Sequence, residues 1–196
     1  MINNPSYDEF LKNVKNHSLE KLKDDDVYRH LTFSNNSSFN QKFHITTWPG
    51  YLAFTGDMGD FLFSRLKDMF EFFRDDLSLG RINPSYWSEK VMAGKWRRFS
   101  LDKFRSNVLF DVRGQLDLGD DEEMPKDIMD DLYYLLTASD EYECVAQIRD
   151  FQHDKISFDD FWEHDNTEYN YHYVWACYAI VWGISKYDNN RLAIKE

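Results

Sequence analysis

Two carboxylates stand close together in a glycine-rich stretch, Gly56-Asp57-Met58-Gly59-Asp60. Paired carboxylates are typical of a hydrolytic acid–base pair or of a site for a hard cation such as calcium. Nothing nearby completes a calcium-binding loop, and two carboxylates are few ligands for that ion. Glycine also supplies the positive-φ positions of tight hairpins, and aspartate caps such turns. We therefore favour a structural turn and keep a hydrolytic or metal site at Asp57 and Asp60 as an alternative.

Histidines followed by aspartates recur eleven residues apart, at His153-Asp154 and His164-Asp165. Histidine with carboxylates is a common ligand set for transition metals. The spacing matches no strong motif, such as two histidines four residues apart on a helix with an acid between them. In a segment so rich in aspartate, such pairs are expected by density alone. The sequence therefore predicts no metal and no cofactor, and a cryptic metal enzyme at His153 and His164 is kept as an alternative.

No pattern of an activated nucleophile or of a phosphate-binding loop occurs in the chain. It contains neither a Gly-x-Ser-x-Gly elbow nor a dinucleotide fingerprint, which are the usual signs of such chemistry. The two cysteines, Cys144 and Cys177, have no metal or redox spacing and stand among apolar neighbours. They are predicted to be buried, inert thiols in a reducing compartment. We expect a protein that is not an enzyme.

The segment from Trp87 to Arg105 is both basic and aromatic. Cations that alternate with aromatic rings are typical of proteins that neutralise phosphates and stack on bases. The net charge of −12 disfavours direct binding to a polyanion. A nucleic-acid-binding regulator is thus the second hypothesis; the competing interpretation is that the cations face the chain's own acids while the rings fill the core. The residues that would bind nucleic acid are Lys95, Trp96, Arg97, Arg98, Lys103 and Arg105.

Acidic residues are concentrated towards the C-terminus. Residues 1–116 hold 17 Lys/Arg and 15 Asp/Glu, whereas residues 117–196 hold 6 and 20. Rows of carboxylates on a folded surface can imitate duplex DNA, which carries a charge per roughly 1.7 Å of axis, and can occupy a basic groove of another protein. The competing interpretation is a solvated acidic face without a partner. The candidate surface comprises Asp120, Asp121, Glu122, Glu123, Asp127, Asp130, Asp131, Asp140, Glu141, Asp159, Asp160 and Glu163.

The elements that must position these residues are of both kinds. Short stretches rich in β-branched and aromatic residues, separated by turn residues, predict an antiparallel meander of three or four strands. Helical spacing predicts the remaining elements. The expected strands are 28–33, 41–48, 51–55 and 60–63. The expected helices are 7–23, 65–75 capped by Ser64, 84–91, one from Ser100 or Asp102 to 112, 125–137, 139–151, 157–162 and 169–187.

The fold class is therefore predicted to be α+β. A small antiparallel sheet in the N-terminal part, packed by helices, is followed by a mostly helical acidic half. We expect residues 1–116 to form the sheet-and-helix region and residues 117–196 the acidic helical region, packed together as one compact unit. The final aromatic helix is expected to supply the core of the helical half.

Several motifs stand out along the chain: TWPGYL at 47–52, TGDMG at 55–59, FSRL at 63–66, DMFEFFR at 68–74, WACYAIVWGI at 175–184, and Tyr187-Asp188. The combination resembles uncharacterised proteins encoded by bacteriophages and prophages. The resemblance carries no catalytic residues, and it implies a small protein made in a bacterial cytoplasm during infection or lysogeny. By analogy, accessory phage proteins of this size often bind and block host defence.

These observations together predict a phage-encoded, non-enzymatic inhibitor. It would bind a bacterial defence or nucleic-acid-handling complex, for example a CRISPR effector, through an acidic surface that mimics nucleic acid. The polar start at residues 1–8 lacks a secretory signal, and the apolar run 174–184 is shorter than the roughly 20 residues that cross a bilayer. We therefore expect a cytoplasmic protein with no membrane partner; its oligomeric state is left open.

Overall fold

The computed structural model describes residues 4–36, 38–74, 81–119 and 121–193. The chain forms two compact units. The described residues of 2–97 and 169–196 make the first, which we call the sheet unit. Residues 98–168 make the second, which we call the acidic unit because it holds 20 Asp/Glu against 7 Lys/Arg. The acidic unit is thus inserted in sequence between the sheet and the final helix.

The fold class is α+β, as predicted, but the main sheet has six antiparallel strands instead of three or four. Neighbours in the sheet are neighbours in sequence, so the sheet is a simple meander. Each strand pairs antiparallel with the next. The strands are β1 (Ser18–Asp25), β2 (Tyr28–Ser34), β3 (Phe43–Trp48), β4 (Tyr51–Gly56), β5 (Phe61–Ser64) and β6 (Val91–Ala93).

In the main sheet, the sequence did not predict β1 and β6, and both overlap helices that were expected. Helix α1 (Tyr7–Val14) stops well before residue 23, and β1 follows it. The β1 sequence SLEKLKDD is rich in good helix formers, and pairing with β2 overrides that local preference. Strand β6 begins at Val91, the last residue of the helix expected at 84–91, of which only α3 (Pro84–Ser88) forms.

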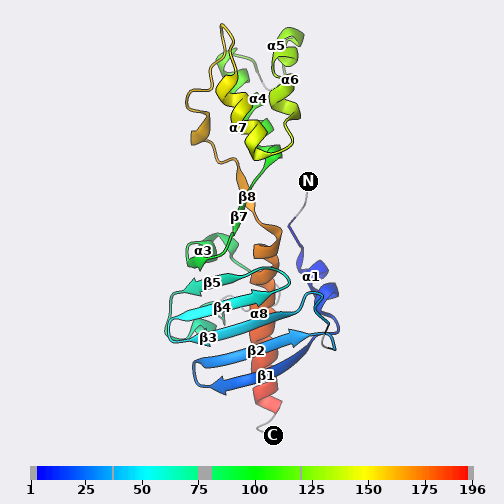
Figure 1. Ribbon diagram of the computed structural model, residues 1–196, viewed down its shortest axis with the longest axis vertical. Helices are drawn as coiled ribbons and strands as arrows, with labels where there is room; N and C mark the ends of the chain where they lie inside the picture. Colours follow the sequence, from blue (N-terminus) through cyan, green and yellow to red (C-terminus); the bar gives the residue numbers. More distant parts are fainter. Residues whose placement is uncertain (1–3, 37, 75–80, 120, 194–196) are drawn as a thin grey trace. The chain divides into compact units, whose positions relative to one another are not determined.

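One face of the sheet is apolar and is covered by the long helix α8 (Tyr171–Ala193), which crosses behind the strands in Figure 1. Inward side chains alternate along each strand, as the pleat requires. They include Leu31, Phe33, Phe43, Ile45, Leu52, Phe54, Phe61 and Phe63. Gly183 of α8 lies close to the sheet, because a Cβ there would stand 2.8 Å from Ile45 Cδ1.

Helix α8 is a core helix, but its core is that of the sheet unit and not that of the acidic half as expected. Tyr173, Trp175, Cys177, Ile180 and Ile184 are all fully buried and belong to the cluster formed with the sheet. An aromatic-rich helix packed on the apolar face of a sheet hides a large area from water, which is the dominant favourable term in folding.

Helices α1 and α3 of the sheet unit begin at clear caps. Ser6 and Glu9 form a capping box at α1, a strong helix-start signal. Asn83 accepts from the Tyr86 N–H with Pro84 at the first helical position, so the predicted start of α3 is confirmed. Helix α2 spans Met69–Arg74; the expectation that Ser64 caps it is wrong, since Ser64 is the last residue of β5.

The acidic unit is a small helical bundle with its own core. Its helices are α4 (Leu101–Gln115), α5 (Lys126–Asp131), α6 (Tyr133–Thr137), α7 (Glu141–Asp150) and the 3-10 turn η1 (Phe161–Glu163). The single helices expected at 125–137 and 157–162 are thus broken and shortened. Ser100, not Asp102, caps α4. The core contains Phe104, Val108, Val112, Ile128, Leu132, Leu135, Cys144, Ile148, Ile156, Phe158 and Phe161.

The predicted boundary at residue 116 differs from the division in the structure. The charge change at that point falls at the end of α4, inside the acidic unit. The chain crosses between units near Arg97 and Tyr169, where β7 (Arg97–Phe99) and β8 (Thr167–Tyr169) form a two-stranded sheet. Charge marks surfaces and apolar residues mark cores, so a change in charge is a poor guide to where a core ends.

A buried ion pair fixes α2 against the sheet. Both terminal nitrogens of Arg29, in β2, lie 2.9 Å from the two carboxylate oxygens of Asp68. The Arg29 guanidinium also lies 4.4 Å from the centre of the Phe70 ring. Burial alone would raise the pKa of Asp68, but hydrogen bonds from Arg29 and from the Phe70 N–H outweigh burial and hold that pKa below its usual value. Arg29 is 4% exposed, so this pair is well shielded from water.

We expect Asp68→Asn to lower the free energy of unfolding by about 3 kcal/mol, because it leaves the buried Arg29 charge uncompensated. Asparagine can still accept the Phe70 N–H as a cap, so the helix start is preserved. The matched control is Asp188→Asn, whose partner Arg74 is about one-third exposed; about 1 kcal/mol is expected there. Urea unfolding measures both, and equal losses would contradict the role of burial.

The same carboxylate predicts a pH dependence with a definite sign. Its pKa is lower in the folded state than the ordinary value near 3.9. Its contribution to stability is therefore complete above that ordinary value and is lost as the pH falls through the folded-state pKa. The difference in unfolding free energy between the natural chain and Asp68→Asn should shrink between pH 6 and pH 2.5. A difference that stays constant across this range would refute the assignment.

Candidate functional site

All described members of the predicted acidic surface are exposed and lie in the acidic unit. Asp120 lies outside the described residues. The others are Asp121, Glu122, Glu123, Asp127, Asp130, Asp131, Asp140, Glu141, Asp159, Asp160 and Glu163. On α5, Ile128 points into the core while Asp127, Asp130 and Asp131 are exposed. This pattern agrees with the prediction that the three acids lie on one face of the helix.

Some of these carboxylates also hold the local backbone. The Asp140 side chain accepts the Glu143 N–H at 2.8 Å and starts α7. Glu122 accepts the Gly119 N–H at 2.8 Å and closes a turn. A carboxylate at a helix N-terminus is favoured by the helix dipole as well as by the hydrogen bond. Asp140 and Glu122 thus belong both to the candidate acidic surface and to the hydrogen bonds that hold the local backbone.

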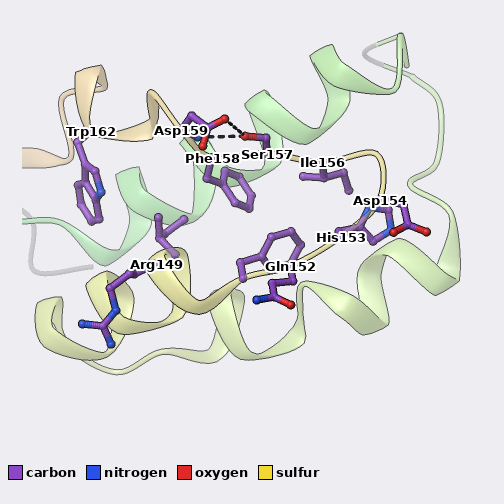
Figure 2. Close-up of a pocket in the computed structure, with 11 residues that line it drawn as sticks. Arg149, Gln152, His153, Asp154, Ile156, Ser157, Phe158, Asp159 and Trp162 are labelled. Atoms are coloured by element: carbon purple, nitrogen blue, oxygen red, sulfur yellow. Dashed lines mark hydrogen bonds between the residues drawn. The ribbon is translucent and has the colours of Figure 1, made fainter.

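A surface groove of about 770 Å³ runs along this unit between α7 and the segment that follows it (Figure 2). Its volume is within the roughly 300–1,000 Å³ of ligand pockets. In Figure 2, Trp162 stands at one end and His153 and Asp154 at the other. The lining residues are Ile148, Arg149, Phe151, Gln152, His153, Asp154, Ile156, Ser157, Phe158, Asp159 and Trp162.

The wall of the groove is anchored to α4 by one amide side chain. Gln115 Oε1 accepts the Ser157 N–H, and Gln115 Nε2 donates to the Ser157 carbonyl, both at 2.8 Å. On either side of Ser157, the buried side chains of Ile156 and Phe158 enter the core. The segment therefore has a defined path although it is not regular secondary structure, and the groove has a fixed wall.

The polar groups of the groove have definite partners. Asp159 accepts the Ser157 hydroxyl at 2.5 Å. His153 Nδ1 accepts the Lys155 N–H at 3.1 Å, while its Nε2 faces Asp131 at 3.6 Å. Sequence reasoning missed Trp162, Gln152 and Ser157 as site residues. No sequence pattern marks them, because the groove arises from the path of an irregular segment against α7.

The basic segment is largely neutralised by the chain's own acids. Arg98 Nη2 lies 2.6 Å from Glu168, and Lys103 Nζ lies 3.1 Å from Asp165. Arg105 donates to a backbone carbonyl at 3.0 Å. Hydrogen bonds from Thr167 and Lys103 lower the pKa of Asp165 to about 2. The competing interpretation, that these cations face acidic residues of the same chain, is confirmed for Arg98 and Lys103.

The aromatic rings of that segment serve the cores. Trp87 and Phe104 are fully buried. Trp96 packs against the sheet core, and Phe99 against the core of the acidic unit. The Arg97 guanidinium lies 4.5 Å from the centre of the Trp96 ring. These rings are not presented as a stacking platform, which removes one of the two features that favoured nucleic-acid binding.

The Asp57–Asp60 stretch is a hairpin turn between β4 and β5. Gly56 and Gly59 have φ of +148° and +90°, and a Cβ on Gly56 would stand 2.3 Å from the Lys42 carbonyl oxygen. Asp57 accepts the Gln41 N–H at 2.7 Å, tying the turn to the preceding loop. The positive-φ glycines agree with the structural interpretation of this motif.

The two histidines of the acidic region have separate partners. His164 Nε2 lies 2.7 Å from Asp111 Oδ1 on α4, and His153 faces Asp131. Within the described residues, no group of three or more His, Cys, Asp or Glu side chains is placed to hold a metal ion. Neither the His153 and His164 region nor the hairpin turn therefore offers a described metal centre.

Comparison with protein-family models, with curated proteins and with solved structures gives no match. The resemblance to phage proteins therefore stays a prediction. No helix in the described ranges combines the length and the apolar character needed to cross a membrane.

The cysteines are free and buried, as predicted. Burial raises the pKa of Cys144 to about 11 and also raises the pKa of Cys177.

At pH 8, a thiol reagent such as Ellman's reagent should react with the native protein about 100-fold more slowly than with the urea-unfolded chain, in which two thiols should react. Rapid reaction of one native thiol would contradict the described packing around it.

Proposed function

We propose that this protein is a non-enzymatic inhibitor that binds a bacterial nucleic-acid-handling or defence complex, such as a CRISPR effector. The acidic unit is the binding element, and its carboxylates occupy a basic groove that normally holds nucleic acid. The phage origin of the protein is part of this proposal and depends on the resemblance in the 47–74 and 175–188 motifs. The working compartment is then the host cytoplasm.

The observation that carries the proposal is the segregation of charge into one folded unit. Residues 98–168 hold 20 Asp/Glu and 7 Lys/Arg, a net charge of −13, whereas the rest of the chain has a net charge of +1. A folded unit that collects nearly all of the net charge produces a strong local negative potential, which steers a basic partner towards it. The described candidate acids are exposed and available for contact.

The alternative of a nucleic-acid-binding regulator receives less support. The aromatic rings of the basic segment 87–105 are buried or packed against the two cores, and Arg98 and Lys103 are paired with acids of the chain. The third hypothesis, a cryptic hydrolase or metal enzyme, has no described cluster of ligands to build on.

Charge reversal on α5 tests the proposal. We expect Asp127→Lys with Asp130→Lys to reduce partner retention at least about tenfold, since exposed charges of the right sign dominate such contacts. The immobilised protein is incubated with bacterial lysate in 50 mM salt, and the retained proteins are identified by mass spectrometry. Retention should also be abolished by 500 mM salt and by excess duplex DNA.

The matched control places the same charge change on the sheet unit. Glu20→Lys with Glu71→Lys alters two exposed acids there and should leave retention unchanged. Equal retention by both double variants, or partners that DNA and salt do not displace, would contradict binding through the acidic unit.

A further inference from the structure

The groove of the acidic unit is lined by an exposed aromatic ring and by carboxylates. Trp162 is 49% exposed although its neighbour Phe161 is buried. Asp154 and Asp159 line the same groove, and both are exposed. Figure 2 shows Asp159 on the wall between Trp162 and Asp154. Tryptophan is the best aromatic platform for a cation, and a nearby carboxylate adds an opposite charge.

Of the residues that the structure describes, Arg149 is the only arginine or lysine that lines the groove, and it is paired with Asp150. Arg149 donates to the two oxygens of Asp150 at 2.8 and 3.2 Å. That leaves the charges of Asp154 and Asp159 at the groove, inside a unit with a net charge of −13. Among the described residues, Asp159 uses one carboxylate oxygen for the Ser157 hydroxyl, and its Oδ1 accepts no hydrogen bond. The electrostatics of the groove therefore select a cation and reject an anion.

An exposed stripe on α7 extends this surface beyond the groove. Tyr142 and Val145 are 83% and 40% exposed, and Arg149 stands four residues further along. Residues three, four and seven apart share one side of a helix. Exposed tyrosine and tryptophan are the side chains most often used as anchors in protein interfaces. A ligand longer than a single side chain would find apolar contacts next to the groove.

We propose that the groove binds an arginine-bearing segment of a partner protein, with one arginine side chain stacked on Trp162 and paired with Asp159. This proposal rests on the proposed function and names the chemistry that the acidic unit recognises. Arginine fits better than lysine, because its planar guanidinium both stacks on an indole and donates two parallel hydrogen bonds to a carboxylate. The groove then confers selectivity, while the surrounding acids supply long-range attraction.

The test follows the indole N–H signal of Trp162 in a two-dimensional ¹H–¹⁵N NMR spectrum of the full chain, assigned by its disappearance in Trp162→Phe. Hexa-arginine is titrated at low salt, with hexa-lysine and hexa-glutamate as comparison peptides. Hexa-arginine should shift this signal saturably, hexa-lysine should bind at least about threefold more weakly, and hexa-glutamate should have no effect.

Two double variants with the same change in net charge separate the groove from the general acidity of the unit. Asp154→Asn with Asp159→Asn should raise the dissociation constant for hexa-arginine at least about fivefold, as judged from all shifted signals. Asp102→Asn with Asp117→Asn, two exposed acids of the same unit that lie outside the candidate acidic surface, should raise it less than twofold. Preserved dispersion of the remaining signals shows that each variant is folded.

The outcomes separate this proposal from the broader one. If hexa-arginine binds and both double variants weaken it equally, or if the Trp162 signal does not move, the groove proposal is overturned while binding by the acidic unit stands. If neither cationic peptide binds at low salt, both proposals fail.

Discussion

Mutual repulsion among twenty carboxylates is the constraint that the acidic unit must overcome to fold. Within 71 residues it holds 20 acids and only 7 bases, and a net charge of this size destabilises a compact state. Its apolar core, centred on Phe104, Val108 and Val112, opposes that repulsion. Local hydrogen bonds also offset this repulsion, because acids such as Asp140 and Glu122 accept backbone N–H groups of the fold. The unit can therefore fold although its carboxylates lie close together in sequence.

The sheet unit has a different physical basis. Its net charge is near zero, and its stability depends on the aromatic side chains between α8 and one face of the sheet. The buried Arg29–Asp68 pair and the half-buried Arg74–Asp188 pair link α2 to the strands and to α8. The two units thus differ in charge: the sheet unit is weakly charged, and the acidic unit carries nearly all of the net charge of the chain.

The sequence predicted those parts of the structure that depend on local signals. The strands from Tyr28 to Ser64 alternate clearly, and Asn83-Pro84 marks a helix start without ambiguity. Strand β1 could not be predicted, because Leu, Glu and Lys favour helices and only pairing with β2 makes that segment extended. The exposed acids were identifiable from composition. The groove was not, because its wall is an irregular segment whose path is fixed by hydrogen bonds between Gln115 and Ser157, more than forty residues apart in sequence.

The paired strands β7 and β8 have an evolutionary consequence. Ser100 donates its backbone N–H to the Asn166 carbonyl at 2.8 Å, and Asn170 donates to the Trp96 carbonyl at 2.9 Å. The outgoing and returning chains are thus adjacent at the border of the sheet unit, and adjacent chain ends are what permit one domain to be inserted into another. The segment between Trp96 and Asn170 could therefore be exchanged for another small domain during evolution, while the strand pairing of the main sheet and the packing of α8 on it stay intact.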